Sequence, residues 1–159
     1  MGTSDDTGNT TLGDLLTEGT TVMFTTVGED GALFSRPMTV QEYADGVLRF
    51  VTQRDTHVAR DADGRQVNVA LSESSRWVSI SGTARVVDDI ELKRRLWDTV
   101  TDAFAEQGPE DPVNVVVEVD PDAASMWDSP GAVGTLLALV KSKVTGETGR
   151  PGEQRDLPV

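Results

Sequence analysis

Apolar and polar residues alternate in several short segments of the chain, and this period of two is typical of β-strands with one buried face. The pattern is clearest in residues 77–87, where Val78 and Ile80 share one face while serine, threonine and arginine occupy the other. Residues 113–119 are apolar on both faces, as expected for a strand that is covered on both sides. Six segments are predicted as strands: 20–27, 32–40, 47–52, 66–71, 77–87 and 113–119. Residues 125–129 are predicted as a final short strand or turn.

Other segments carry the signals of helices and of tight turns. Glycine-containing turns at 28–31 and 43–46 separate predicted strands at hairpin spacing. The longest helical pattern brings Leu92, Leu96 and Val100 onto one face. Four helices are predicted: 11–19, 56–64, 88–108 and 133–144.

Short strands at hairpin spacing with few helices predict a mainly β protein. We expect a closed or half-closed antiparallel barrel rather than alternating βαβ units. With 159 residues, the chain is long enough to bury one substantial core. Residues 1–10 and 147–159 contain little that could be buried, so we expect two mobile tails around a domain at 11–146.

The composition excludes several classes of protein. The chain has no cysteine, which rules out disulfide frameworks, thiolate metal sites and cysteine nucleophiles. Its formal net charge of -13 argues against binding to nucleic acids or to anionic membranes. The chain begins without a basic and apolar leader, and it has no apolar run of membrane-spanning length. We therefore expect a cytoplasmic protein.

The acidic charge is unevenly distributed. Residues 36–76 contain six arginines and six acidic residues, so this segment is neutral and the rest of the chain carries the whole negative charge. The same segment contains His57, the only histidine. One interpretation is a pocket for an anion inside an acidic protein, and the alternative is chance spacing of surface charges.

Candidate catalytic groups are scarce. A hydrolytic triad or a metal site would have to use His57, and Asp55 and Asp61 do not stack with it on one helix face. If the protein performs chemistry, a bound cofactor must supply it. Arg36, on a predicted strand beside Pro37, is the best candidate for a phosphate contact because its guanidinium is planar and permanently charged. The alternative is that Arg36 pairs with an acid and that Thr56 merely caps a helix.

Several separated motifs resemble one known family. The stretches "VMFTTVGEDGALFSRPMTVQE", "GVLRFVTQRDTHVA", "QVNVALSESSRWVSISGTARVV" and "MWDSP" appear in the order found in the pyridoxamine 5'-phosphate oxidase-like FMN-binding split-barrel superfamily. The chain is most similar to its general stress protein 26 branch, over residues 12–146. The resemblance implies a six-stranded antiparallel split barrel with flanking helices. It also implies a homodimer that binds flavin mononucleotide (FMN) in a cleft between its subunits.

The same resemblance assigns residues to the flavin by position. The "SRPM" motif would lie along the flavin, with Arg36 near the phosphate or the ring edge, and "FVT" would contact the ring and the ribityl chain. A serine or threonine and a lysine bind phosphate in the family, and Thr56 and His57 stand at these positions. Trp127 would match an aromatic residue near the cofactor, or would simply pack in the core. The implied cofactor-binding residues are Ser35, Arg36, Pro37, Met38, Phe50, Val51, Thr52, Thr56, His57 and Trp127.

Two departures from the family pattern limit the functional inference. His57 replaces a lysine, so phosphate binding should be weaker or more pH-dependent unless Arg54 or Arg60 compensates. The chain also lacks the C-terminal arginine-histidine motif of true pyridoxamine phosphate oxidases, so we do not expect oxidation of vitamin B6.

The resemblance leaves three functions open. The first is an FMN-dependent oxidoreductase or a flavin reductase-like stress protein, with a nicotinamide nucleotide as a possible partner and a deazaflavin as an alternative cofactor. The second is a flavin-binding or flavin-storing protein without catalytic activity. The third is a split-barrel dimer that has lost its cofactor.

Overall fold

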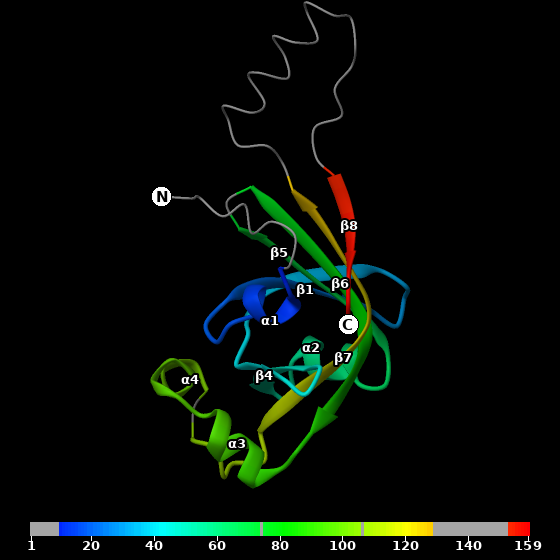
Figure 1. Ribbon diagram of the computed structural model, residues 1–159. Coiled ribbons are helices and arrows are strands. Elements are labelled where there is room, and N and C mark those ends of the chain that lie inside the picture. Colours follow the sequence, from blue (N-terminus) through cyan, green and yellow to red (C-terminus); the bar gives the residue numbers. More distant parts are fainter. Residues whose placement is uncertain (1–9, 74, 106, 129–152) are drawn as a thin grey trace, which may run out of the picture.

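A computed structural model of the chain describes residues 10–73, 75–105, 107–128 and 153–159. The strands of these segments form one antiparallel sheet that curls into a half-barrel (Figure 1), which confirms the predicted fold class. The sheet has eight described strands instead of the six expected. They are β1 (Thr21–Val27), β2 (Leu33–Thr39), β3 (Glu42–Ala44), β4 (Val47–Gln53), β5 (Gln66–Glu73), β6 (Arg76–Val87), β7 (Asn114–Asp128) and β8 (Glu153–Leu157).

The strand order along the sheet is β2-β1-β5-β6-β7-β4-β3, and β8 also pairs with β7. Residues 113–119 and 125–129, predicted as two segments, belong almost entirely to the single strand β7. One edge of β7 pairs with β6, and the other edge pairs first with β4 and then with β8. The register between β6 and β7 shifts between Ser81 and Gly82, where a Cβ on Gly82 would collide with the carbonyl oxygen of Asp120. Only glycine fits this close approach of two backbones.

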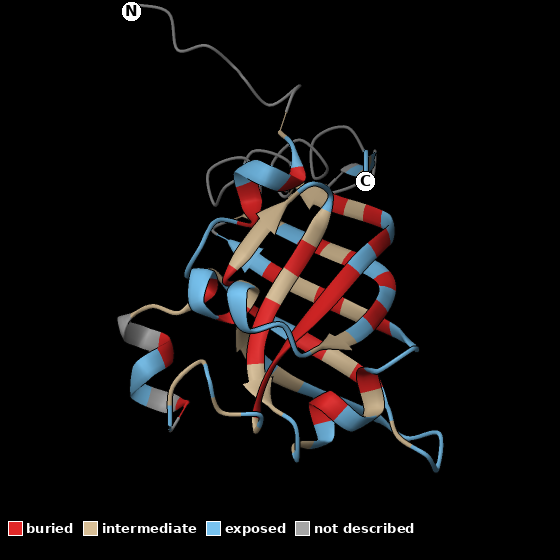
Figure 2. Cartoon of the chain, turned by 90° about the horizontal axis from the view of Figure 1, so that it is seen from below, coloured by how far each residue is buried: buried red, intermediate tan, exposed pale blue. Residues whose placement is uncertain are grey.

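The core lies on the concave side of the sheet. Buried and exposed residues alternate along the strands (Figure 2), and β6 shows the alternation that the sequence predicts. The rings of Phe24 on β1 and Phe50 on β4 meet edge to face, with 5.2 Å between their centroids. The first half of β7 is buried on both faces, because α3 (Ile90–Leu96) contributes Leu96 to a second, smaller cluster with Val116.

Short helices connect and cover the strands. α1 (Leu12–Leu15) begins with a capping box in which Thr11 and Asp14 exchange hydrogen bonds. α2 (His57–Ala62) packs against β1, β4, β6 and β7. The predicted helix 88–108 is instead two helices, α3 and α4 (Thr99–Phe104). Asp98 causes this break because its side chain accepts the N–H of Thr101 at 2.7 Å and starts a new helix.

The C-terminal segment differs from the expected mobile tail, since Glu153–Leu157 form β8 against β7. Its polar sequence gives no alternating signal, and the pairing depends on the backbone of β7 together with a few side chains. The hydroxyl of Ser125 donates a hydrogen bond to the carboxylate of Asp156 at 2.9 Å, Arg155 pairs with Asp128, and Leu157 packs against the main core. The predicted helix 133–144 lies outside the described residues. No helix among the described residues is long and apolar enough to cross a membrane.

Arginines and glutamates form a connected group at the other end of the sheet order from β2. Arg49 contacts Glu42 at 2.6 Å and Glu118 at 2.8 Å, Arg85 contacts Glu118 at 2.9 Å, and Arg95 also binds Glu42. The pKa of Glu42 lies below its usual range, chiefly because Arg95 donates a hydrogen bond to its carboxylate, and Arg49 adds to the effect. We refer to these five residues as the arginine-glutamate network.

Candidate functional site

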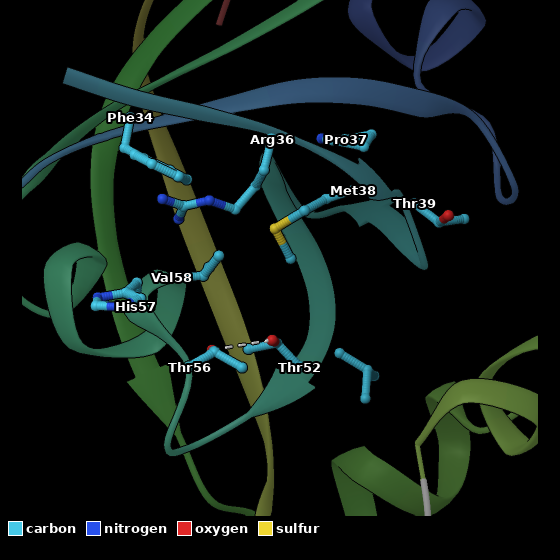
Figure 3. A pocket seen from close by; sticks show the side chains of 10 residues that line it. Phe34, Arg36, Pro37, Met38, Thr39, Thr52, Thr56, His57 and Val58 are labelled. Carbon is cyan, nitrogen blue, oxygen red and sulfur yellow. Dashed lines mark hydrogen bonds between the residues drawn. The ribbon is translucent and has the colours of Figure 1, made fainter.

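A cavity of about 500 Å³ opens between β2, β4 and the start of α2. Four strands separate β2 from β4 in the sheet order, yet both line the same cavity, because the curled sheet brings strands from opposite ends of that order close together. This first cavity is lined by Phe34, Arg36, Pro37, Met38, Thr39, Val51, Thr52, Thr56, His57 and Val58 (Figure 3). Its size is within the usual range for sites that bind small molecules and cofactors.

The alternation of β2 decides which of its side chains point into the cavity, while Pro37 and Thr39 also border it. Phe34, Arg36 and Met38 share the face that points toward α2 and β4 (Figure 3). Ser35 lies on the opposite face, where its hydroxyl bonds to that of Thr25 at 2.9 Å. β2 pairs only with β1 among the described strands, and Pro37, which lacks an N–H, is suited to such an edge strand.

Arg36 is the central polar group of the first cavity. Its Nη2 donates to the hydroxyl of Thr26 at 3.2 Å, and its guanidinium lies over the ring of Phe34, 4.7 Å from the centroid. Nη1 is buried and has no hydrogen-bond partner. Within the described residues, no carboxylate is close enough to Arg36 for an ion pair. Burial lowers the pKa of Arg36 below its usual range, and the negative charge of Asp61 opposes this shift.

A buried donor without a partner is costly, so Nη1 of Arg36 is a strong candidate for binding an anion that enters the cavity. The alternative that Arg36 serves an internal ion pair does not match this geometry. The cavity therefore fits the phosphate or another anionic part of a cofactor such as a flavin.

Thr56 has a local structural role at the same time. Its hydroxyl donates to the carbonyl of Gln53 at 2.7 Å and accepts the N–H of Ala59 at 3.4 Å, which caps α2. Thr52 lies 3.4 Å from the Thr56 hydroxyl (Figure 3). Since the proton of Thr56 is directed to Gln53, Thr52 is the donor in this contact, and the oxygen of Thr52 remains able to accept a hydrogen bond from a ligand.

Arg54 and Arg60, the two arginines proposed to compensate for the missing lysine, have different surroundings. His57 is exposed at the cavity mouth, and its Nδ1 is 3.5 Å from Nη2 of Arg60. Arg54 instead binds Asp88 at 2.7 Å and the carbonyl of Pro112 at 3.2 Å, and it does not line the cavity. Of these two arginines, Arg60 is therefore the one placed to assist His57.

The structure brings together most of the predicted site residues, namely Arg36, Pro37, Met38, Val51, Thr52, Thr56 and His57. Ser35, Phe50 and Trp127 are not among the residues that line the cavity. Phe50 is fully buried in the core, and Trp127 pairs with Trp77 in the register of β7 and β6.

Sequence reasoning missed Phe34, Thr39 and Val58. Period-two alternation from Arg36 would have identified Phe34, which shares its face of β2. Among the described residues, no group of three or more histidine and acidic side chains could hold a metal ion.

The fold and cavity define a half-barrel protein with a cofactor-sized cavity beside a buried arginine, and comparison with known proteins places it in a family. The family model described as "Pyridoxamine 5'-phosphate oxidase like" matches residues 8–150. The chain belongs to this family. A search of curated proteins gave no match to the chain.

Solved structures support the same conclusion about the fold. A putative general stress protein 26 from Jannaschia sp. is 24% identical, with a TM-score of 0.64 over 87% of this chain and 90% of that chain. A general stress FMN/FAD binding protein from Xanthomonas citri is 33% identical, with a TM-score of 0.62 over 72% of this chain and 83% of that one. A protein described as an F420 reductase is 20% identical, with a TM-score of 0.55 over 69% and 92% of the two chains. The similarities to the Jannaschia protein and to the F420 reductase, both below 25% identity, concern the fold alone.

Proposed function

We propose that this protein binds FMN in the first cavity and acts as a flavin-dependent oxidoreductase or flavin reductase-like stress protein. The observation that carries the proposal is the buried Nη1 of Arg36, which has no hydrogen-bond partner among the described residues. This is notable because the chain is acidic, with a formal net charge of -13. The similarity to the FMN/FAD binding protein from Xanthomonas citri supports the choice of a flavin.

The flavin would supply hydride and electron transfer. Arg36 would bind the anionic part of the cofactor with its free N–H groups. The hydroxyl of Thr52 and the ring of His57 would add polar contacts, while Met38 and Val51 would provide an apolar wall. A nicotinamide nucleotide is the proposed electron donor.

We also propose a homodimer. One face of the β1–β2 hairpin exposes large apolar side chains, namely Met23, Val27 and Leu33, and Leu33 is 74% exposed. Such a group is typical of a surface that contacts another protein. Phe34, which is also exposed, lies on the opposite face of β2 and lines the first cavity, so both faces of this edge strand present apolar side chains. Size-exclusion chromatography with light scattering should give a dimer, and Leu33→Asp should give a folded monomer; a wild-type monomer would contradict the proposal.

The test of flavin binding starts with a visible absorption spectrum of the purified protein and chromatography of the small molecule that denaturation releases. Released FMN would support the proposal, and a deazaflavin would replace FMN as the cofactor. A colourless protein that also fails to bind added FMN would reject it and favour a cofactor-free dimer. Arg36→Ala should abolish retention of the flavin, whereas the control Arg94→Ala, at an exposed ion pair outside the cavity, should keep it.

Nicotinamide oxidation by the flavin-loaded protein separates the two remaining functions. Turnover of NADH or NADPH would support an oxidoreductase. Flavin that stays bound and is not reduced by either nucleotide would instead favour the storage or binding function.

A further inference from the structure

A second cavity, of about 560 Å³, lies directly beside the first one. The two cavities share Phe34 and His57 as common walls. The second cavity is formed by the β1–β2 turn and α2, and its lining residues are Gly28, Glu29, Asp30, Ala32, Phe34, His57, Arg60, Asp61 and Arg65. A ligand that occupies the first cavity could therefore extend past His57 into the second.

The arginines that line these two cavities differ from the other described arginines in having no ion pair with a carboxylate. Most arginines in the described ranges form ion pairs with carboxylates, namely Arg49, Arg54, Arg76, Arg85, Arg94, Arg95 and Arg155. In the same ranges, the arginines without such a pair are Arg36, Arg60 and Arg65. Arg36 lines the first cavity, and Arg60 and Arg65 line the second. The described arginines that remain without a carboxylate thus all line one of these two neighbouring cavities.

Other contacts hold the two arginines of the second cavity in place without neutralising them. Nη2 of Arg60 is 3.5 Å from Nδ1 of His57. Nη1 of Arg65 donates to the carbonyl of Val27 at 3.4 Å, at the end of β1. These contacts leave most of the N–H groups of both guanidinium groups available to a ligand.

Carboxylates also line the second cavity, and they restrict the class of ligand. Asp30 accepts the N–H of Ala32 at 3.0 Å and so stabilises the turn. Glu29 is exposed at the turn, and Asp61 is half-buried on α2. A ligand portion that suits both charges carries an anionic group for the arginines and hydroxyl donors for a carboxylate. A phosphorylated ribose has this combination.

We propose that the second cavity binds the distal phosphate and ribose of a flavin dinucleotide, with Arg60 and Arg65 as the contacts of that phosphate. The proposal rests on flavin binding in the first cavity. In this arrangement Arg36 binds the part of the ligand in the first cavity, and the tail continues past His57. The chain would then prefer flavin adenine dinucleotide (FAD) over FMN.

The test compares the affinities of FAD, FMN and riboflavin by flavin fluorescence and calorimetry. The wild-type protein should bind FAD about tenfold more tightly than FMN. Arg60→Ala combined with Arg65→Ala should remove this difference, because it should weaken FAD binding about tenfold more than FMN binding, which Arg60 supports only through His57. The double variant Arg76→Ala with Arg94→Ala removes the same charge outside both cavities and should keep the preference. High salt should reduce the ratio of the two affinities, because exposed contacts are screened.

The outcomes separate failure of the subsite from failure of the proposed function. Equal affinity of the wild-type protein for FMN and FAD would overturn the dinucleotide subsite while leaving flavin binding intact. An equal loss of both ligands in the Arg60 and Arg65 variant would overturn it too. A third outcome concerns a deazaflavin with a carboxylate tail. If its affinity depends on Arg60 and Arg65 and that of FAD does not, the second cavity binds carboxylates instead of a phosphate, and the dinucleotide assignment is overturned. Absence of any flavin binding would reject the proposed function, and the subsite with it.

Discussion

Arginines occur in two contrasting regions of this molecule. In the arginine-glutamate network, Arg49 lies between Glu42 and Glu118 at 2.6 and 2.8 Å, so its charge is balanced inside the protein. At the cavities, Arg36, Arg60 and Arg65 have no ion pair with the described carboxylates, although the chain carries a net charge of -13. The first region links four secondary-structure elements, β3, β4, β6 and β7, to α3. In the second region the three arginines line cavities that a ligand can fill.

The difference indicates which arginines stabilise the fold and which ones bind a ligand. An arginine that is ion-paired with carboxylates contributes to the stability of the fold, and its removal is destabilising because it leaves partly buried carboxylates without a counter-charge. An unbalanced arginine contributes little to the stability of the free protein, and its removal should weaken ligand binding instead. Substitutions in the two regions should therefore affect different measurements.

The largest effect is expected for Arg49→Met in the network. The side chain of Arg49 is 14% exposed, and its loss leaves Glu42 and Glu118 with weaker partners in a mostly buried setting. The free energy of unfolding should fall by about 3 kcal/mol, measured by urea denaturation. Adding Glu118→Gln should restore part of the loss. A change below about 1 kcal/mol would mean that the network does not stabilise the fold.

Arg36→Met should affect binding and spare stability. Flavin affinity should fall about a hundredfold, because a charge-assisted contact in a partly buried site is lost. The ligand-free free energy of unfolding should change by less than about 1 kcal/mol, since Arg36 has only Thr26 and Phe34 as partners. Calorimetric titration and urea denaturation measure the two quantities. Unchanged flavin affinity would remove Arg36 from the site.

The network should also make stability depend on pH. The folded-state pKa of Glu42 is lowered, so the folded protein binds this proton less tightly than the unfolded chain does. Its stabilisation is complete above the ordinary glutamate range and is lost as the pH falls through the lowered pKa. Between pH 7 and pH 3, the wild-type protein should lose about 1 kcal/mol more than Glu42→Gln. Parallel curves for the two proteins would contradict this assignment.

The smallest effect is expected at the cavity mouth. His57→Lys adds a full positive charge where the family pattern has a lysine, and it should increase flavin affinity about fivefold at pH 7.5. The matched control His57→Gln keeps a hydrogen-bond donor without the charge and should leave the affinity within about twofold. Equal affinities of the lysine and glutamine variants would show that His57 does not approach the anionic part of the ligand.

The sequence predicted most strands because buried and exposed residues alternate strongly along them. It did not predict β8, because residues 153–157 have little apolar alternation and pair through the backbone of β7. The break between α3 and α4 was missed because the capping by Asp98 interrupts an apolar period that continues beyond it. Local patterns describe a strand or a helix well, and they contain little information about pairing with distant segments.

The same limit applies to the site. The guanidinium of Arg36 was a reasonable candidate from its chemistry and position, and the structure places it in the cavity without an ion pair to the described carboxylates. Ser35 was grouped with it by the family motif, although alternation along β2 sends the two side chains to opposite faces. The second cavity was not predicted, because it depends on how α2 approaches the β1–β2 turn.

The position of β7 also bears on how the chain folds during synthesis. The pairs β1–β2 and β5–β6 join neighbouring segments, so they can form soon after those segments leave the ribosome. β4, in contrast, waits for β7, with Gln53 pairing to Asn114 and Leu48 to Val119. Until then β4 and β6 each have an unpaired edge, which can pair with another nascent chain. Formation of β7 should therefore limit the folding rate, and the interval before it is when the chain most needs protection by chaperones.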